Sequence, residues 1–249
     1  MKNIQGKTII ITGASSGIGK ATAVKLAENG AQLVLAARNE AKLKKITKDL
    51  IEKYDIKAVY KVTDVTQEKD IKDLVNFTIS NFHKVDVLFN NAGLMPVSLL
   101  RDGKSDEWER MIDVNLKGAL YGIKHVLPIM ENQHNGQIIV TDSVAGHFVG
   151  AGSAVYSATK FAMRAIMEGL RVEEVGNGIK STLISPGHSQ TSLASTISDE
   201  KMKADVLKNE TDAGLKAEDV ANAVVYAIST PDNVGINEII LRSTNQRDY

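Results

Sequence analysis

The sequence predicts an α/β protein with a doubly wound parallel sheet of about seven strands and helices on both faces. Short runs of β-branched apolar residues alternate with longer amphipathic runs along the chain, which is the pattern of a parallel sheet covered by helices. The short runs are nearly continuous in apolar residues, as expected of strands buried on both faces. A chain of 249 residues, 43% of them hydrophobic, is long enough for a large core without covalent staples.

The strands are predicted where these short apolar runs fall. In chain order they are Thr8–Thr12, Gln32–Ala37, Ala58–Val62, Val85–Asn90, Gln137–Thr141, Lys180–Ser185 and Glu238–Leu241. Right-handed crossovers between successive strands then place them all in one sheet.

The helices are predicted between the strands, where apolar residues recur with the helical period. They are Gly17–Asn29, Glu40–Tyr54, Gln67–Phe82, Asp106–Asn132, Ala154–Val175 and Ala217–Ser229. Gly30, directly after the first helix, is predicted to end it as a C-terminal cap.

No repeat, low-complexity segment or linker divides the chain, so residues 1–249 are predicted to form one domain. The stretch Gly187–Thr211 differs from the rest because it is rich in Ser and Thr and only weakly periodic. Long segments of this kind in compact domains are usually functional. We therefore expect residues 188–211 to form a mobile flap over a substrate.

Composition excludes several classes of function. Lys plus Arg and Asp plus Glu are both 30, and this balance argues against nucleic acid or a membrane surface as the main partner. The absence of cysteine excludes disulfides and thiolate nucleophiles. No apolar run approaches the ~18 residues that span a bilayer. We expect a soluble, cytoplasmic protein.

A glycine-rich loop, Thr12–Gly19, lies between the first predicted strand and the first helix. A pyrophosphate needs backbone N–H groups, a helix N-terminus behind it and no Cβ atoms in the way. Gly13, Gly17 and Gly19 meet this need, because they lack Cβ atoms and lie at the start of the predicted helix. The alternative is a turn without a ligand, because one glycine loop is a weak signal. Its strand–loop–helix context favours a dinucleotide site and hence a Rossmann fold.

The end of the second strand predicts which dinucleotide is bound. An acidic residue at this point would bind the adenosine ribose hydroxyls of NAD, but the chain has Ala37 followed by Arg38 and Asn39. A guanidinium binds a 2′-phosphate, whereas a carboxylate repels it. The sequence therefore favours NADP(H), although most single arginines are only solvated surface charges.

Tyr156 and Lys160 are four residues apart in a predicted helix, so the phenol and the ammonium share one face. A nearby cation lowers the pKa of a phenol and makes it a usable acid or base. Ser143 follows a strand that ends at the same edge of the sheet, where open α/β sheets bind ligands. The Tyr-x-x-x-Lys spacing alone is weak evidence for an active site, and it gains weight only together with the other motifs.

Together these motifs resemble the short-chain dehydrogenase/reductases. The resemblance rests on TGASSGIG near the N-terminus, Asn90–Gly93, Asn115, Ser143 and the run YSATK from Tyr156 to Lys160. Their order and spacing match over essentially the whole chain. Asp142, where the family often has a second Ser, is a departure from the common pattern, as are His188 and Ser189.

The resemblance implies an enzyme that moves a hydride between NADP(H) and an alcohol or carbonyl compound. Tyr156 would transfer the proton, Ser143 would hold the substrate oxygen, Lys160 would lower the Tyr156 pKa and bind the nicotinamide ribose, and Asn115 would anchor a water-linked proton relay. The expected cofactor-binding residues are Gly13, Ser15, Ser16, Gly17, Ile18, Gly19, Arg38, Asn39, Asp64, Val65, Asn91, Ala92, Gly93, Tyr156, Lys160, Pro186, Gly187 and Thr191.

The resemblance also implies a homo-oligomer, most simply a tetramer. Helices 106–132 and 154–175 are the expected interface, because their apolar residues exceed one stripe. The residues concerned are Met111, Leu116, Leu120, Phe161, Met163 and Met167.

Two alternative functions remain open from the sequence. The first is a hydrolase in which Ser143 is the nucleophile, but the sequence around Ser143 lacks the G-x-S-x-G motif. The second is a non-catalytic NADP(H)-binding sensor, which would keep the fold but would not need Ser143, Tyr156 and Lys160. No metal is expected, because the histidines lack ligand spacing. His188 is interpreted as an exposed loop residue, with substrate contact as the alternative. The substrate itself does not follow from the sequence.

Overall fold

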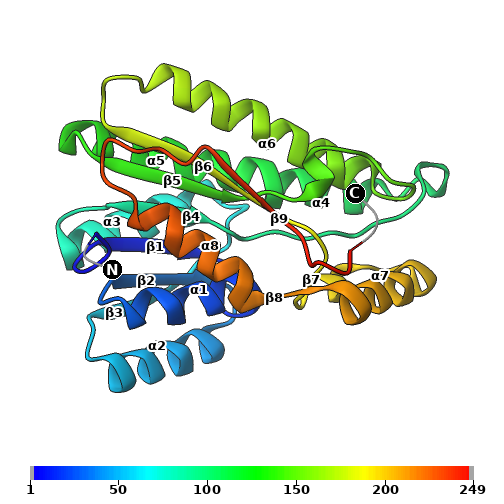
Figure 1. The fold of residues 1–249 in the computed structure, drawn as a ribbon, viewed down its shortest axis with the longest axis horizontal. Coiled ribbons are helices and arrows are strands. Elements are labelled where there is room, and N and C mark those ends of the chain that lie inside the picture. The colour runs from blue at the N-terminus through cyan, green and yellow to red at the C-terminus, as the bar shows by residue number, and fades with distance from the viewer. Residues whose placement is uncertain (1–2, 247–249) are drawn as a thin grey trace.

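A computed structural model describes residues 3–246 and contains a seven-stranded parallel sheet. Its strand order is β3-β2-β1-β4-β5-β6-β9 (Figure 1). The strands are β1 (Thr8–Thr12), β2 (Gln32–Ala37), β3 (Ala58–Val62), β4 (Val87–Asn90), β5 (Gly136–Thr141), β6 (Ile179–Pro186) and β9 (Glu238–Leu241). The order reverses at β1, so β1 and β4 flank the point where a doubly wound sheet opens a crevice. The predicted fold class is confirmed.

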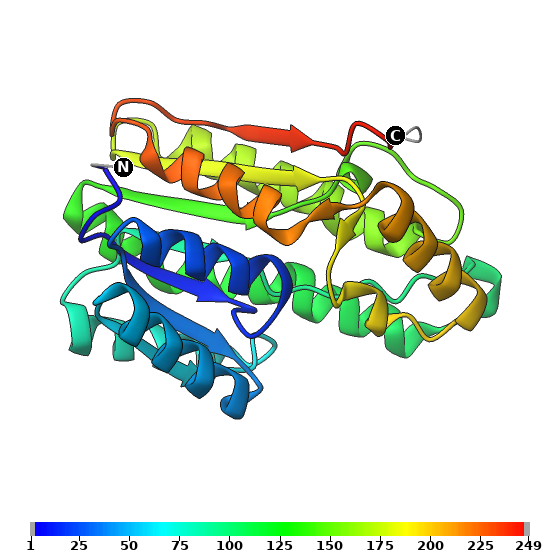
Figure 2. The same cartoon turned by 60° about the horizontal axis from the view of Figure 1, so that its bottom comes forward.

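Helices cover both faces of the sheet, as Figure 2 shows for the helices in front of it and behind it. One face is packed by α1 (Gly17–Glu28), α2 (Glu40–Tyr54) and α8 (Ala217–Ser229), which contribute Leu26, Leu43 and Val224 to one buried cluster. The opposite face is packed by α3 (Glu68–Phe82), α5 (Gly118–Gln133) and α6 (Ala154–Glu173). The predicted strands and helices therefore agree with the structure to within two residues at nearly every boundary.

The long helix predicted at 106–132 consists of three consecutive segments. They are α4 (Ser105–Met111), a π-helical segment η2 (Ile112–Lys117) and α5. A π-helical turn holds an extra residue and often occurs at a functional site. Here it contains Asn115, which is buried. Hydrophobic periodicity cannot reveal such a change, because the apolar side of the helix continues through it.

Three of the expected interface residues belong to the core instead. Met111, Met163 and Met167 are 1–2% exposed, because helices between a sheet and neighbouring helices bury more than one stripe. Leu120 and Phe161 are 38% and 42% exposed. The extra apolar positions in these helices are thus explained in part by internal packing.

The stretch after β6 contains structure that the sequence pattern did not predict. The short strand β7 (Ser189–Gln190) pairs with β8 (Leu215–Lys216), and between them lie a 3-10 turn η4 (Leu193–Thr196) and the helix α7 (Glu200–Ala213). The Asp199 side chain caps α7 by accepting a hydrogen bond from Met202 N at 2.9 Å. Glu210 is the one buried residue of this helix, so no apolar period marks it. Among residues 3–246, no helix is both long and apolar enough to cross a membrane.

Candidate active site

A cavity of about 1240 Å³ lies at the carboxyl ends of the strands. The strands are parallel, so the loops that follow β1, β2, β4, β5 and β6 all reach this edge. All of the predicted catalytic and cofactor-binding residues except Gly19 and Asn115 line the cavity. The sequence motifs are therefore brought to one place.

The glycines of the loop allow it to pack closely against neighbouring backbone and side chains. Gly13 has a φ of +66°, and a Cβ there would lie 2.9 Å from the Asn91 amide nitrogen. Gly19 does not reach the cavity, but a Cβ on it would lie 2.5 Å from the Gly13 carbonyl oxygen. Gly19 thus allows α1 to start close against the loop. Free N–H groups at a helix start favour a phosphate ligand, so the loop fits a dinucleotide pyrophosphate.

Threonine and asparagine side chains join three strand ends, a feature that the sequence reading did not single out. The Thr12 hydroxyl accepts hydrogen bonds from the backbone N–H groups of Asn91 at 2.9 Å and Ala92 at 3.1 Å. The Asn91 side chain donates to the Thr12 carbonyl at 3.1 Å and accepts from the Thr141 hydroxyl at 3.0 Å. These bonds hold the ends of β1, β4 and β5 in a fixed arrangement beside the cavity.

At the outer end of the cavity, the connection after β2 supplies a cation. Arg38 is exposed and lines the cavity, and within residues 3–246 no ion pair or hydrogen bond occupies its guanidinium. Asn39 caps α2 by accepting from Lys42 N at 2.9 Å. Asp64 accepts two hydrogen bonds from Thr66, at 3.0 Å from the backbone and 2.8 Å from the hydroxyl. The group available for a phosphate here is Arg38.

Asn115 connects the π-helical segment to the loop after β4. Its side-chain oxygen accepts from Leu94 N, and its amide nitrogen donates to the Leu94 carbonyl, both at 2.9 Å. The same nitrogen donates to the Thr159 hydroxyl at 3.3 Å. Both amide hydrogens are therefore engaged, and Asn115 holds the loop against α6 rather than lining the cavity.

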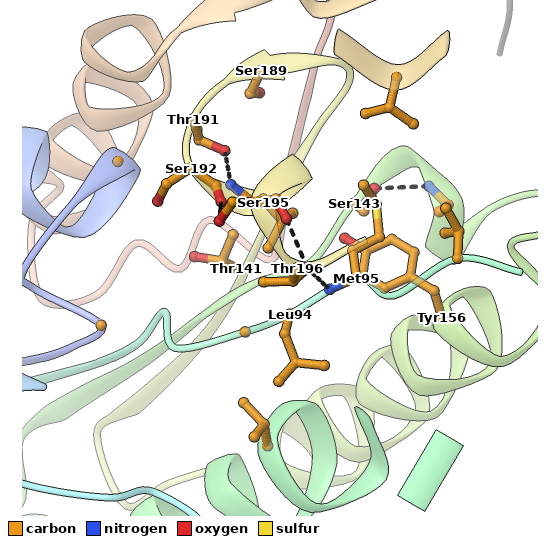
Figure 3. Close-up of a pocket in the computed structure, with 18 of the residues that line it drawn as sticks. Leu94, Met95, Thr141, Ser143, Tyr156, Ser189, Thr191, Ser192, Ser195 and Thr196 are labelled. Carbon is orange, nitrogen blue, oxygen red and sulfur yellow. Dashed lines mark hydrogen bonds between the residues drawn. The ribbon is translucent and has the colours of Figure 1, made fainter. Parts of the chain in front are cut away.

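Ser143, Tyr156 and Lys160 converge inside the cavity. Ser143 follows β5 and accepts a hydrogen bond from Ala145 N at 3.1 Å, and Figure 3 shows its side chain beside the Tyr156 ring. The Lys160 ammonium donates to the Thr141 carbonyl at 2.7 Å and lies 5.6 Å from the centre of the Tyr156 ring. The spacing of four residues thus brings the phenol and the ammonium to one side, as predicted.

The direction of the Tyr156 pKa differs from the one predicted from its spacing to Lys160. Burial raises the pKa of the phenol, and a hydrogen bond with the Ser143 side chain opposes that rise. Burial also lowers the pKa of Lys160, against the opposing charge of Asp142. Tyr156 and Lys160 are only 6% and 7% exposed, and spacing along a helix does not report this burial. The protonated phenol is the favoured form.

Asp142 belongs to a group of charged side chains behind Ser143. Burial raises its pKa to about 6, and the charge of Lys160 is the main opposing influence. Oxygen and nitrogen atoms of Asp142, His147 and Glu238 lie within 4.8 Å of one another. Arg164 approaches the same place, with Nη1 at 2.8 Å from His147 Nε2 and 2.5 Å from Glu238 Oε1. Arg164 therefore brings a positive charge close to both carboxylates.

Residues after β6 close the cavity on its remaining side. The Thr196 hydroxyl accepts a hydrogen bond from Met95 N at 2.9 Å, and Ser192 lies 3.1 Å from the Ser16 hydroxyl of the glycine loop. Figure 3 shows this segment facing Ser143 and Tyr156. His188 is half-buried and lines the cavity, so it is not the exposed loop residue that the sequence favoured.

The sheet order, the glycine loop and the cavity at the strand ends define a Rossmann-type α/β protein. The chain belongs to the short-chain dehydrogenase family, since the family model described as short chain dehydrogenase matches residues 7–202. It is therefore an oxidoreductase of the short-chain dehydrogenase type. The family predicted from the motifs is confirmed.

Relatives and solved structures agree with this membership. An uncharacterized oxidoreductase of Staphylococcus saprophyticus is 48% identical over 99% of both chains, and one of Listeria monocytogenes is 47% identical over 98% of both. An alcohol dehydrogenase from Thermococcus sibiricus, in complex with 5-hydroxy-NADP, has a TM-score of 0.89 at 28% identity, covering 98% of this chain and 100% of its own. A Burkholderia phymatum enzyme in complex with NAD has a TM-score of 0.88 at 28% identity, covering 96% and 90%. The structural neighbours thus include complexes with both types of nicotinamide cofactor.

Proposed function

We propose that this protein transfers a hydride between NADP(H) and an alcohol or carbonyl substrate, with Tyr156 as the general acid and base. The observation that carries the proposal is the convergence of Ser143, Tyr156 and Lys160 in the cavity that the glycine loop opens. When bound, the nicotinamide supplies or accepts the hydride. The protein itself supplies the binding surface and the proton.

The cofactor-binding half of the proposal rests on two features of the cavity. The helix α1 begins at the end of the glycine loop without a side-chain cap, so its first N–H groups are offered to the pyrophosphate. Arg38 offers an unpaired guanidinium where the 2′-phosphate of NADP(H) is expected. We assign the remaining cavity residues from the loops after β3, β4 and β6 to contacts with the rest of the cofactor.

The catalytic half follows from the position and the protonation of the phenol. Tyr156 donates its proton to the substrate oxygen during carbonyl reduction and removes it during alcohol oxidation. Ser143 holds the same oxygen, because its hydroxyl lies beside the phenol. Burial favours the protonated phenol, which is the form that reduction requires. Lys160 carries the cation that binds the nicotinamide ribose.

The proposal also covers the domain organisation, the cellular location and the oligomeric state of the protein. We treat residues 1–249 as one cytoplasmic catalytic unit with a flap at 188–211, and we propose that it forms a homotetramer. The exposed side chains of Leu120 and Phe161 support a contact through α5 and α6. Light scattering at micromolar concentration should give a mass above that of the 27.0 kDa monomer, and a monomer would contradict the oligomer.

A panel of ketones, aldehydes and alcohols, followed by NADPH absorbance, tests the activity. We expect NADPH oxidation with at least one carbonyl compound and little with NADH. The Tyr156→Phe variant is the matched control, because it removes one hydroxyl. Tight NADPH binding without turnover of any substrate would replace the proposal by a cofactor sensor.

A further inference from the structure

The helix α7 presents one face to the substrate side of the cavity. Met202, Val206 and Glu210 are spaced by four residues, so they share that face, and all three line the cavity. Met202 and Val206 pack against the buried cluster that contains Tyr156 and Leu94. This wall is therefore apolar near the proposed proton donor and acidic at its far end.

Glu210 is buried although its carboxyl group has no partner. The residue is 8% exposed, and within residues 3–246 no side chain or backbone group forms a hydrogen bond or ion pair with the carboxylate. Only its backbone carbonyl is engaged, accepting from the Gln190 amide at 3.1 Å. The carboxyl oxygens are not among the fully enclosed polar atoms without a partner, so they reach the space of the cavity that Glu210 lines. A carboxylate that is largely removed from bulk water and faces a cavity without a protein partner favours a ligand that can bind it.

The charges around Glu210 do not supply that partner. His188 on the β6–β7 connection and Lys216 on β8 belong to elements that pack beside this end of α7, and Asp205 lies on α7 itself. None of them shifts the Glu210 pKa, which burial alone raises to about 7. Acids also outnumber bases among the other ionisable residues that α4, η2 and the start of α7 contribute to the cavity wall. They are Asp106, Glu109, Arg110, Asp113, Asp199, Lys201 and Asp205.

We propose that Glu210 selects the substrate by binding a cationic amino group that is separated from the reacting oxygen by an apolar segment. The ammonium provides the hydrogen bonds and the charge that the carboxylate lacks. Met202 and Val206 contact the apolar segment, and the carbonyl or alcohol oxygen reaches Ser143 and Tyr156. A substrate with a carboxylate at the same end is repelled. The inference rests on the proposed function and narrows its substrate class to amino ketones and amino alcohols.

The test compares three ketones of similar length that end in a primary amine, a methyl group or a carboxylate. kcat/KM is measured at pH 8 for the full-length wild type, Glu210→Gln and Glu200→Gln. In the wild type we expect the amine to be preferred over the methyl compound, and the carboxylate to be the poorest substrate. Glu210→Gln should reduce the amine-to-methyl ratio by about 10- to 100-fold, mainly through KM, since a charged hydrogen bond contributes about 1.5–3 kcal/mol.

Glu200→Gln is the matched control, because it makes the same substitution on the same helix at a side chain that is 84% exposed and does not line the cavity. Solvent screens that charge, so the ratio should change less than about twofold. Equal ratios in the wild type and Glu210→Gln would overturn the role of Glu210 while leaving the oxidoreductase function intact. Inactivity of the wild type toward all three ketones and the broader panel would contradict the proposed function itself.

A pH series on the wild type does not depend on any variant folding. The amine of the substrate stays protonated up to about pH 9, whereas Glu210 loses its proton as pH rises through about 7. The amine-to-methyl ratio should therefore rise between pH 6 and pH 8. A ratio that stays constant over this range would contradict the proposal.

Discussion

The glycine-loop end of the molecule and the α7 end are built in different ways, although both border the same cavity. At the first end, β1 is completely buried and α1 packs six buried residues against it and its surroundings. At the second end, α7 has fourteen residues and buries only Glu210. The comparison shows that extensive apolar burial positions the glycine-loop end, whereas the α7 end is held by a smaller apolar cluster and a few polar contacts.

Those polar contacts are individually weak. The segment from β7 to α7 buries Ala194 and Ile197 in a small apolar cluster. Its polar contacts are the Thr196–Met95 bond, the Ser16–Ser192 contact and the two-residue pairing of β7 with β8. A typical hydrogen bond contributes about 1 kcal/mol to stability. Opening this segment is therefore expected to cost far less than opening the sheet.

Tyr156 lies where the two ends meet, and its hydroxyl gives the largest expected effect. Tyr156→Phe should lower kcat by about 10²–10⁴-fold, the usual loss for a missing general acid, while the Kd for NADPH stays within a few fold. Steady-state NADPH oxidation at saturating substrate measures kcat, and fluorescence titration measures the Kd. Tyr226→Phe, at a side chain that is 55% exposed, is the control. A kcat near that of the wild type in Tyr156→Phe would remove the phenol from the mechanism.

A smaller effect is expected at Arg38, on the rigid cofactor side. Arg38→Gln should lower kcat/KM for NADPH by about 10- to 100-fold, because a charge-assisted bond to the 2′-phosphate is lost, and should leave kcat/KM for NADH nearly unchanged. Ala37→Asp should also shift the cofactor preference toward NADH, because the new carboxylate repels the 2′-phosphate of NADPH. Arg101→Gln, at an exposed arginine that does not line the cavity, should leave both values unchanged. Wild-type preference for NADH would refute the assignment of the phosphate to Arg38.

The same difference between the two ends explains what could be predicted from the sequence. The strands and helices could be predicted from apolar periodicity, and the cofactor loop from glycine at points where backbone groups approach closely. The Ser143–Tyr156–Lys160 group could be predicted from the spacing of four residues, the strand end before Ser143 and the resemblance to the family. The helix α7 was missed because its single buried residue is an acid, which no hydrophobic pattern records. The π-helical segment at Asn115 was missed because one extra backbone residue leaves the composition unchanged.

Electrostatic features were the least predictable. A spacing of four residues correctly placed Lys160 beside Tyr156 but gave the wrong direction for the phenol pKa, since that direction is dominated by burial. The joining of Thr12, Asn91 and Thr141 depends on the alignment of three strands that are distant in sequence. Such contacts become visible only after the register of the sheet is known.

The smallest expected effect tests the flap directly, by comparing two lysine-rich helices. The helix α2 carries exposed lysines but buries Leu43, Ile46, Thr47 and Leu50, whereas α7 carries Lys201 and Lys208 at exposed positions and buries only Glu210. Trypsin should therefore cut α7 before α2, because cleavage needs local unfolding and α7 has less packing to lose. The rate of fragment formation, followed by mass spectrometry, measures the difference.

Thr196→Val then shows whether the polar contacts hold the flap. The substitution keeps the shape but removes the bond from Met95, so cleavage in α7 should become about fivefold faster, corresponding to about 1 kcal/mol, while cleavage in α2 stays the same. NADP(H) with a substrate should slow cleavage in α7, because closure over a ligand stabilises the closed form. If α2 and α7 were cut at equal rates, or if ligand left the α7 rate unchanged, residues 188–211 would be a fixed wall of the cavity rather than a flap. The two ends of the molecule would then differ in composition but not in mobility.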